Sequence, residues 1–263
     1  MPDVDHYAPG TPSWVDMSSP DTDASAAFYS ALFGWEAGEP GTVEETGGYR
    51  MFSLRGRSVA GLGPTRDGGP PPMWTTYITV ADADATCAAA AAAGGTVFMQ
   101  PMDVLEAGRM AVIADPQGAV FAIWQPNLHP GSQIVNEPGS LVWNELAARD
   151  TSPEPAFYAA VFGWTADTEP LGEMPYTTWR LGDKPVGGMV QMTDEWPAEM
   201  PPHWMAYFAV ADTDAACARA AELGGTIHVP ARDIEGVGRF AVIGDPQGAP
   251  FSVIAMRATP PQP

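Results

Sequence analysis

The stretch WVDMSSPDTDASAAFYSALFGW, from Trp14 to Trp35, decides the fold because the chain contains it twice. It returns 129 residues later as WNELAARDTSPEPAFYAAVFGW, beginning at Trp143. Two further segments repeat at nearly the same spacing, WTTYITVADADATCAAAAAAGGT from Trp74 and again from Trp204, and GRMAVIADPQGAVF from Gly108 and again from Gly238. Self-similarity at a fixed spacing marks a repeated structural unit. The 263 residues therefore predict two copies of one domain.

The order of patterns within each copy predicts an α+β fold. SWVDM alternates like a strand, and TDASAAFYSALFGW carries an apolar helical face that Gly34 closes. YRMFSL and SVAGLG then read as strands, and the same order returns with TTYITV, the alanine-rich helix before Gly94, and three more strands. We expect a first domain at residues 1–126, a proline-containing linker at 127–140, a second domain at 141–257 and a tail at 258–263.

Composition excludes several functional classes. The chain has 12 Lys and Arg against 32 Asp and Glu, a formal charge of -20, so nucleic acids and anionic membranes are not expected partners. The first ten residues lack the basic and apolar regions of a secretion signal, which favours a cytoplasmic protein. Cys87 and Cys217 are too few for a disulfide framework or a cysteine-rich zinc site, and we interpret both as buried thiols.

The βαβββ order, the FY…FGW helix ending, the D…GG helix ending and the GR…DPQG turn before a last strand resemble the vicinal oxygen chelate superfamily. That superfamily includes glyoxalase I, extradiol dioxygenases and bleomycin-binding proteins, and the sequence is most similar to its two-domain actinobacterial subgroup, in which glyoxalase-like antigens and accessory proteins of anthracycline biosynthesis occur. The resemblance implies tandem glyoxalase-like domains, each pairing two βαβββ units into a cup-shaped half-barrel. It does not imply one activity, since this fold hosts metal enzymes and metal-free binders alike.

The resemblance also implies where a metal would be held, because the metal enzymes place one ligand on each of four cup-facing strands. The matching positions are Trp14, Gly61, Thr75 and Ala122 in the first domain, and Trp143, Gly188, Met205 and Ser252 in the second. None is a histidine, aspartate or glutamate, which zinc, iron and nickel sites need. We therefore expect no metal or other cofactor, and neither glyoxalase I nor ring-cleaving dioxygenase activity.

Side chains alternate along a strand, so these positions predict which residues line the cups. The expected ligand-binding residues are Trp14, Gly61, Thr75, Ala122, Trp124, Trp143, Gly188, Met205 and Ser252. Glycine leaves room, and aromatic side chains supply flat walls that suit a planar ligand. The structural alternative is that the aromatic residues fill a half-barrel that has lost its metal.

Two carboxylates fall on the same faces, Asp16 beside Trp14 and Glu145 beside Trp143. A carboxyl group in an apolar cup has a raised pKa and can serve as a general base or acid. Tyr77 and Tyr207 are the partner acids that the pattern places on the same inner surfaces. Alternatively, each carboxylate accepts hydrogen bonds from a loop, or pairs with Arg109 or Arg239.

The remaining polar motifs predict structural roles. His6, His129, His203 and His228 are scattered without metal-ligand spacing and are interpreted as surface or structural residues. Asp115 and Asp245 begin DPQG, which is typical of a tight turn between strands.

The expected function is metal-independent binding of a small aromatic, polyketide-like metabolite, for sequestration or hand-over in antibiotic biosynthesis or self-resistance. A biosynthetic oxidoreductase is a candidate partner, and the protein is expected to be a monomer or a homodimer. The alternative is a cofactor-independent isomerase, lyase, hydroxylase-like enzyme or aldehyde detoxifier that uses a cup carboxylate. A third reading makes one cup a degenerate scaffold.

Overall fold

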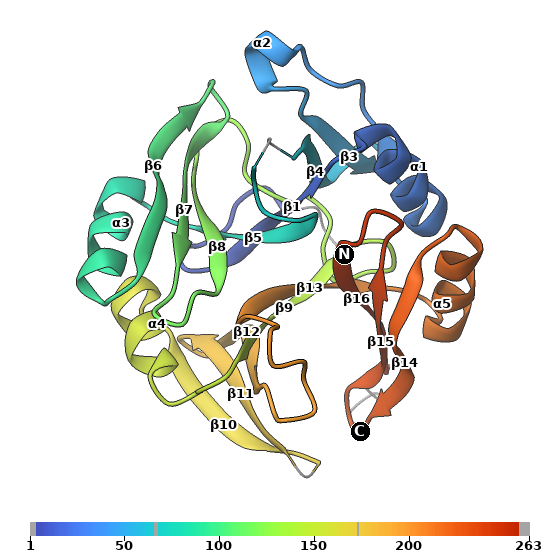
Figure 1. The fold of residues 1–263 in the computed structure, drawn as a ribbon. Helices are drawn as coiled ribbons and strands as arrows, with labels where there is room; N and C mark the ends of the chain where they lie inside the picture. Colours follow the sequence, from blue (N-terminus) through green and yellow to red (C-terminus); the bar gives the residue numbers. More distant parts are fainter. Residues whose placement is uncertain (1–3, 66–67, 173, 258–263) are drawn as a thin grey trace, which may run out of the picture.

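Each copy folds as strand, helix and three strands, twice over (Figure 1). The structure is a computed structural model that describes residues 4–65, 68–172 and 174–257, so the expected tail at 258–263 lies outside the described residues. The first copy contains β1 (Pro12–Ser19), α1 (Thr22–Phe33), β2 (Glu36–Ala37), α2 (Val43–Thr46), β3 (Arg50–Leu54), β4 (Arg57–Pro64), β5 (Met73–Thr79), α3 (Ala83–Ala92), β6 (Thr96–Val104), β7 (Gly108–Ala114) and β8 (Val120–Pro126). The second copy contains β9 (Leu141–Ala148), α4 (Glu154–Phe162), β10 (Thr165–Leu171), β11 (Met174–Leu181), β12 (Lys184–Gln191), β13 (His203–Ala209), α5 (Thr213–Glu222), β14 (Thr226–Ile234), β15 (Gly238–Gly244) and β16 (Pro250–Met256).

The helix boundaries follow from capping chemistry. Asp21 precedes α1, and its side chain accepts a hydrogen bond from the backbone N–H of Ala24, which satisfies a donor that the helix leaves free. Gly34 ends the helix at φ 72°, a left-handed conformation that glycine adopts without a Cβ clash. The sequence predicted this helix and its end. It did not predict β2 or the short α2, which lie in the following loop region.

Each copy builds its own eight-stranded mixed sheet, in the order β2-β3-β4-β1-β5-β8-β7-β6 and, for the second copy, β10-β11-β12-β9-β13-β16-β15-β14. The central strand β1 runs parallel to β4 and antiparallel to β5. The two units therefore pair within a copy, not between copies. Because side chains alternate, one face of β1 presents Trp14 and Asp16, and the other presents Val15 and Met17.

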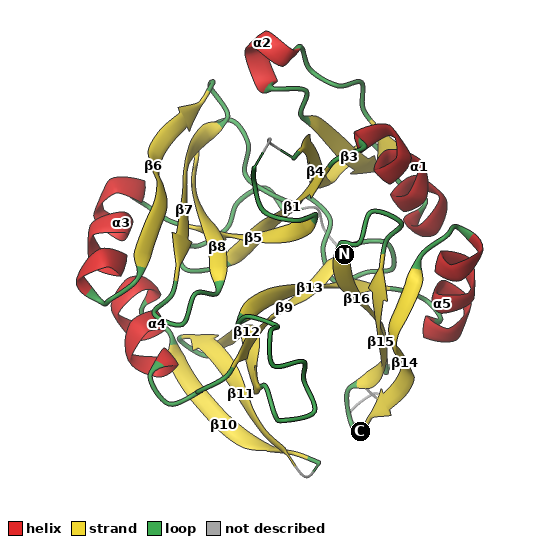
Figure 2. Ribbon diagram, viewed as in Figure 1, coloured by secondary structure: helices red, strands yellow, loops and turns green. Residues whose placement is uncertain are grey.

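The two sheets stand back to back, and their hollow sides face away from each other (Figure 2). Two shared cores fill the contact between the copies. One joins Met17 and Phe28 to Phe251 of the second copy, and the other joins Phe121 to Tyr158 and Trp204. Helix α1 lies beside α5, and α3 lies beside α4 (Figure 1). Among the described residues, no helix has the length and apolar character needed to span a membrane.

A hydrogen-bonded chain secures each of these two contacts. Trp74 Nε1 donates to Tyr29 Oη at 3.0 Å, and Tyr29 Oη donates to Asp245 Oδ2 at 3.0 Å. In the other contact, Trp204 Nε1 donates to Tyr158 Oη at 3.1 Å, and Tyr158 Oη donates to Asp115 Oδ2 at 2.9 Å.

The DPQG aspartates also cap their own turns, as the sequence predicted. Asp115 Oδ1 accepts from the backbone N–H groups of Gln117 and Ala119. The tyrosine of each FY motif thus meets the DPQG turn of the opposite copy, which gives these aspartates a docking role that the turn reading missed.

The contacts differ at one helix position. Glu154, in the first turn of α4, is fully buried and accepts a hydrogen bond from Gln117 Nε2. Burial and the nearby carboxylate of Asp115 raise the pKa of Glu154. The equivalent residue in α1 is Ser25, a neutral hydroxyl within hydrogen-bond distance of Ser19 Oγ.

Candidate functional site

The hollow face of the first sheet, called cup 1, is built by the strands on either side of β1. Trp14 of β1, Tyr77 of β5, and Ala122 and Trp124 of β8 form its buried floor. Met51, Met110 and Val112 pack against this floor. Trp14, Tyr77 and Trp124 are only 4%, 7% and 6% exposed, so most of their ring surface is covered by neighbouring residues.

Asp16 is the polar centre of cup 1. Its Oδ2 accepts hydrogen bonds from Tyr77 Oη at 2.7 Å and from Tyr49 Oη at 3.4 Å. Trp14 Nε1 in turn donates to Tyr49 Oη at 3.1 Å. Burial disfavours the charged carboxylate and raises the pKa of Asp16 to about 6, although both tyrosine hydrogen bonds act against this rise. Asp16 as a whole residue is half-buried on this face.

The hollow face of the second sheet, cup 2, repeats this arrangement. Tyr207 Oη donates to Glu145 Oε1 at 2.7 Å, and Trp143 Nε1 donates to Tyr176 Oη at 2.9 Å. Burial raises the pKa of Glu145, whereas hydrogen bonds from Tyr207 and Tyr176 and the charge of Arg232 lower it. Both cups therefore hold a carboxyl group between two tyrosines.

The four tyrosines are hydrogen-bond donors at neutral pH. Burial and the adjacent carboxylate raise the pKa of Tyr77 and Tyr49 well above the ordinary value, and the same causes act on Tyr207. Such a group can orient a ligand hydroxyl or carbonyl. Asp16 beside them can exchange a proton with a ligand, because its pKa of about 6 lies close to neutrality.

Sequence reasoning named Tyr77 and Tyr207 but missed Tyr49 and Tyr176. Tyr49 precedes β3, and Tyr176 lies in β11. The signal was present, because GGYR and MPYT place a tyrosine at equivalent points of the two copies, 127 residues apart.

The same tyrosines correct the interpretation of the glycines. A Cβ on Gly61 would lie 1.7 Å from Tyr49 Oη, and one on Gly188 would lie 1.9 Å from Tyr176 Oη. These glycines accommodate a tyrosine, so the expectation that they leave open space for a ligand is wrong.

His129 also belongs to the surroundings of cup 1. Its ring meets Trp14 edge to face with centroids 4.4 Å apart, and it contacts Trp124 at 5.9 Å. Its backbone carbonyl accepts a hydrogen bond from Trp124 Nε1 at 2.8 Å. Within the described residues, His129 Nε2 is buried without a hydrogen-bond partner, and burial lowers the pKa of the ring to about 4. The linker thus supplies a neutral imidazole to the wall of the cup.

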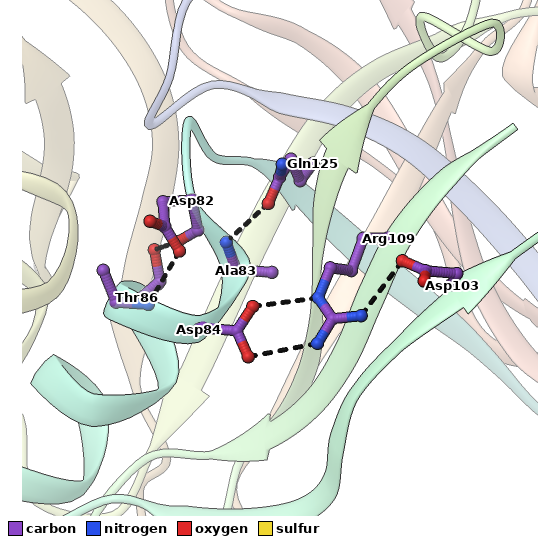
Figure 3. Close-up of polar contacts among 8 residues, drawn as sticks. Asp82, Ala83, Asp84, Thr86, Asp103, Arg109 and Gln125 are labelled. Carbon is purple, nitrogen blue, oxygen red and sulfur yellow. Dashed lines mark hydrogen bonds and ion pairs between the residues drawn. The ribbon is translucent and has the colours of Figure 1, made fainter. Parts of the chain in front are cut away.

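Neither carboxylate pairs with the arginines considered from sequence. Arg109 Nε donates to Asp84 in the first turn of α3 at 2.9 Å, and Arg109 Nη1 donates to Asp103 of β6 at 3.0 Å (Figure 3). Arg239 makes the equivalent bond to Asp214 at 2.7 Å. The arginine alternative is therefore wrong for Asp16 and Glu145. These arginines tie the helix starts to the sheets.

The metal positions of the superfamily do not carry a suitable donor set. The register places Asp16 beside Gly61 and Thr75, and Tyr77 beside Ala122, so the four central strands do meet there. Their side chains at the matching positions are indole, hydrogen, hydroxyl and methyl in cup 1. Among residues 4–65, 68–172 and 174–257, no group of three or more histidine, cysteine, aspartate or glutamate side chains is placed to hold a metal ion.

The remaining expected cup residues lie on the same faces. Thr75 and Met205 are half-buried beside their carboxyl groups, opposite Asp16 and Glu145. Ser252 lies beside Tyr207 on the floor of cup 2. Outside the cups, an open groove of about 350 Å³ runs between the end of α1, the linker and the start of α5. It contains none of the cup residues.

Comparison with known proteins identifies the family. Residues 4–123 match the Glyoxalase/Bleomycin resistance protein/Dioxygenase superfamily, and residues 143–254 match a glyoxalase-like domain. The chain belongs to this superfamily. A Mycobacterium tuberculosis relative, CFP32, described as a candidate glyoxylase, is 43% identical over 258 residues, covering 97% of this chain and 98% of the relative. DnrV of Streptomyces peucetius, an anthracycline biosynthesis protein, is 41% identical over 95% of both chains.

Solved structures of the superfamily share the fold at low identity. The Mn(II)-bound glyoxalase from Novosphingobium aromaticivorans has a TM-score of 0.65 at 18% identity, covering 94% of this chain and 82% of that one. The 2,3-dioxygenase LapB from Pseudomonas sp. KL28 has a TM-score of 0.64 at 14% identity, covering 98% and 97%. These superfamily likenesses establish the fold alone.

Proposed function

We propose that the protein binds a small, planar, polyketide-like aromatic molecule in its cups without the help of a metal ion. The observation that carries the proposal is the half-buried Asp16, held by Tyr77 at 2.7 Å within a face of aromatic side chains. Aromatic walls favour a flat ligand, and a few fixed polar groups orient it. The similarity to DnrV supports the ligand class.

The charge of the chain bears on which aromatic molecules reach the cups. A formal charge of -20 raises the local concentration of cationic ligands, such as those that carry an amino sugar. Sequestration, or hand-over to a biosynthetic oxidoreductase, is the role that fits a binder of this kind.

Calorimetric titration with a panel of anthracyclines and simpler quinones tests the proposal, with tryptophan fluorescence as a second readout. We expect saturable binding below millimolar ligand. Trp14→Phe and Trp143→Phe report quenching in cup 1 and cup 2, and Trp196→Phe, which is part of neither cup floor, is the control. If no compound binds saturably below about millimolar concentration, the proposal fails.

A second candidate function is cofactor-independent catalysis in the same cups. It is favoured by the pKa of Asp16, which burial raises to about 6, within reach of a proton-donating tyrosine. In this case Asp16→Asn or Glu145→Gln abolishes turnover and leaves ligand affinity nearly unchanged. Equal losses of binding and turnover would assign both carboxylates to ligand orientation. Product formation by sub-stoichiometric protein in metal-free buffer is the measurement that separates an enzyme from a binder.

A further inference from the structure

Arg232 is a cation on the face of cup 2. It lies opposite Phe240 in the register of β14 and β15, and Phe240 belongs to the apolar floor of that cup. Directly opposed residues of antiparallel strands point to the same side of a sheet. The guanidinium carbon lies 4.9 Å from the centroid of the Phe240 ring, which is a cation–π contact.

The hydrogen-bonding edge of this guanidinium makes no contact with a polar group among the described residues. In the described part of the chain, Arg232 has neither a hydrogen bond nor an ion pair with another residue, whereas Arg109 and Arg239 each bind two aspartates. The charge of Arg232 lowers the pKa of Glu145, but the hydrogen bonds of Glu145 come from Tyr207 and Tyr176. Stacking on a ring uses only the flat face of a guanidinium, so its five N–H donors remain available to a planar anion.

Cup 1 has no cation at the equivalent position. Met102 lies opposite Met110 in β6 and β7, where cup 2 has Arg232 opposite Phe240. Each cup holds one carboxyl group, Asp16 or Glu145, so the arginine is the charge by which the two cups differ. The floor also differs, because Ser252 in cup 2 replaces Ala122 in cup 1.

From this difference we propose that cup 2 is an anion-selective site, in which Arg232 binds the carboxylate of an aromatic acid whose ring lies against Trp143. The inference rests on the proposed function, since it names the ligand class for one of the two cups. Cup 1 then takes neutral or cationic aromatic ligands. Charge-assisted, bidentate contacts of this type are among the stronger hydrogen bonds in proteins, which makes the carboxylate the group that decides selection.

The test compares two ligands of nearly equal shape, anthraquinone-2-carboxylate and anthraquinone-2-carboxamide, by calorimetric titration at pH 7.5. We expect the native protein to bind one equivalent of the acid at least about tenfold more tightly than the amide. Arg232→Met introduces the residue of cup 1 and should reduce the affinity for the acid to that for the amide, with the amide unchanged. Arg232 is exposed, so its replacement should leave the fold intact, and circular dichroism checks this.

The reciprocal variant, Met102→Arg, should create a second site that prefers the acid. The preference should also weaken as salt rises from 0.05 to 0.5 M, since a partly exposed ion pair is screened. An acid-to-amide affinity ratio that Arg232→Met leaves unchanged would overturn the anion site.

The ligand pair also separates the two proposals. Equal saturable binding of acid and amide by the native protein overturns the selectivity of cup 2 while the binding function stands. If neither ligand, nor any member of the quinone and anthracycline panel, binds saturably, the binding function itself fails, and the anion site fails with it.

Discussion

The contacts that dock the two copies have stayed nearly alike, whereas the two cups have diverged. On the docking side, Tyr29 reaches Asp245 at 3.0 Å and Tyr158 reaches Asp115 at 2.9 Å, each with a tryptophan donating to the tyrosine. In the cups, the carboxyl group and its tyrosines recur, but the neighbouring residues differ. His129 and Met102 lie beside cup 1, and Arg232 takes the position of Met102 in cup 2. The repeat therefore preserves the assembly of the molecule, and the differences lie where a ligand would be chosen.

Removing either docking aspartate should have the largest effect. Asp245→Ala leaves the buried Tyr29 hydroxyl and the backbone N–H groups of Gln247 and Ala249 without their acceptor. We expect a loss of about 2 to 4 kcal/mol in the free energy of unfolding, measured with urea, and a similar loss for Asp115→Ala. Asp183→Ala, at an exposed turn, is the control and should change stability by less than about 0.5 kcal/mol.

Losses of similar size in Asp245→Ala and Asp115→Ala would establish that both contacts between the copies stabilise the folded protein. A loss below about 1 kcal/mol at Asp245 would contradict the idea that the two docking chains are equivalent.

His129 makes the two cups respond differently to acid. Its pKa is lowered by burial to about 4 from an ordinary value of 6.5, so its contribution to stability is complete above pH 6.5 and is lost as pH falls toward 4. His129→Phe keeps an aromatic ring against Trp14 and cannot be protonated. The variant should therefore lose less stability than the native protein between pH 7.5 and 4.5, by roughly 2 to 3 kcal/mol.

Urea unfolding at the two pH values measures this difference. His228→Phe, at an exposed position of β14, is the matched control. Parallel pH profiles of the native protein and His129→Phe would remove His129 as the acid-sensitive element of cup 1.

The smallest expected effect concerns the carboxyl groups themselves. Since the charge of Arg232 lowers the pKa of Glu145, Arg232→Met should move the titration of Glu145 upward. Met102→Arg should move the titration of Asp16 below its value of about 6. Titration followed by carbon-13 NMR of the side-chain carboxyl groups measures both. An upward shift of the Glu145 titration and a downward shift of the Asp16 titration would show that the position of Arg232 and Met102 determines the electrostatic difference between the cups.

The sequence predicted the features that depend on local pattern. The repeat predicted two copies. The resemblance to the superfamily, combined with the alternation of side chains along β1 and β5, correctly placed Asp16 and Tyr77 on one face. Other contacts between residues that lie far apart in the sequence were missed. Tyr49 reaches Asp16 because its side chain lies over Gly61, and the alternation of side chains along a strand does not encode that approach.

Contacts between the copies were also beyond sequence reasoning. Tyr29 and Asp245 are 216 residues apart, and each has a satisfactory local explanation, as part of a helix face and as a turn cap. Nothing in either pattern indicates that the two groups meet. The ligand assignments of the cup residues likewise remain predictions, because geometry places these residues together without supplying a ligand.

The buried Glu154 has a consequence for how the molecule opens. Because its pKa is raised from 4.5 to about 7 in the docked state, the closing of the α4 contact takes up a proton between these two pH values. Docking at α4 is therefore coupled to proton concentration through Glu154, a carboxyl group that the α1 contact lacks because Ser25 takes its place. In alkaline solution the two halves of the protein should separate first along α4, and amide hydrogen exchange would record that order of opening.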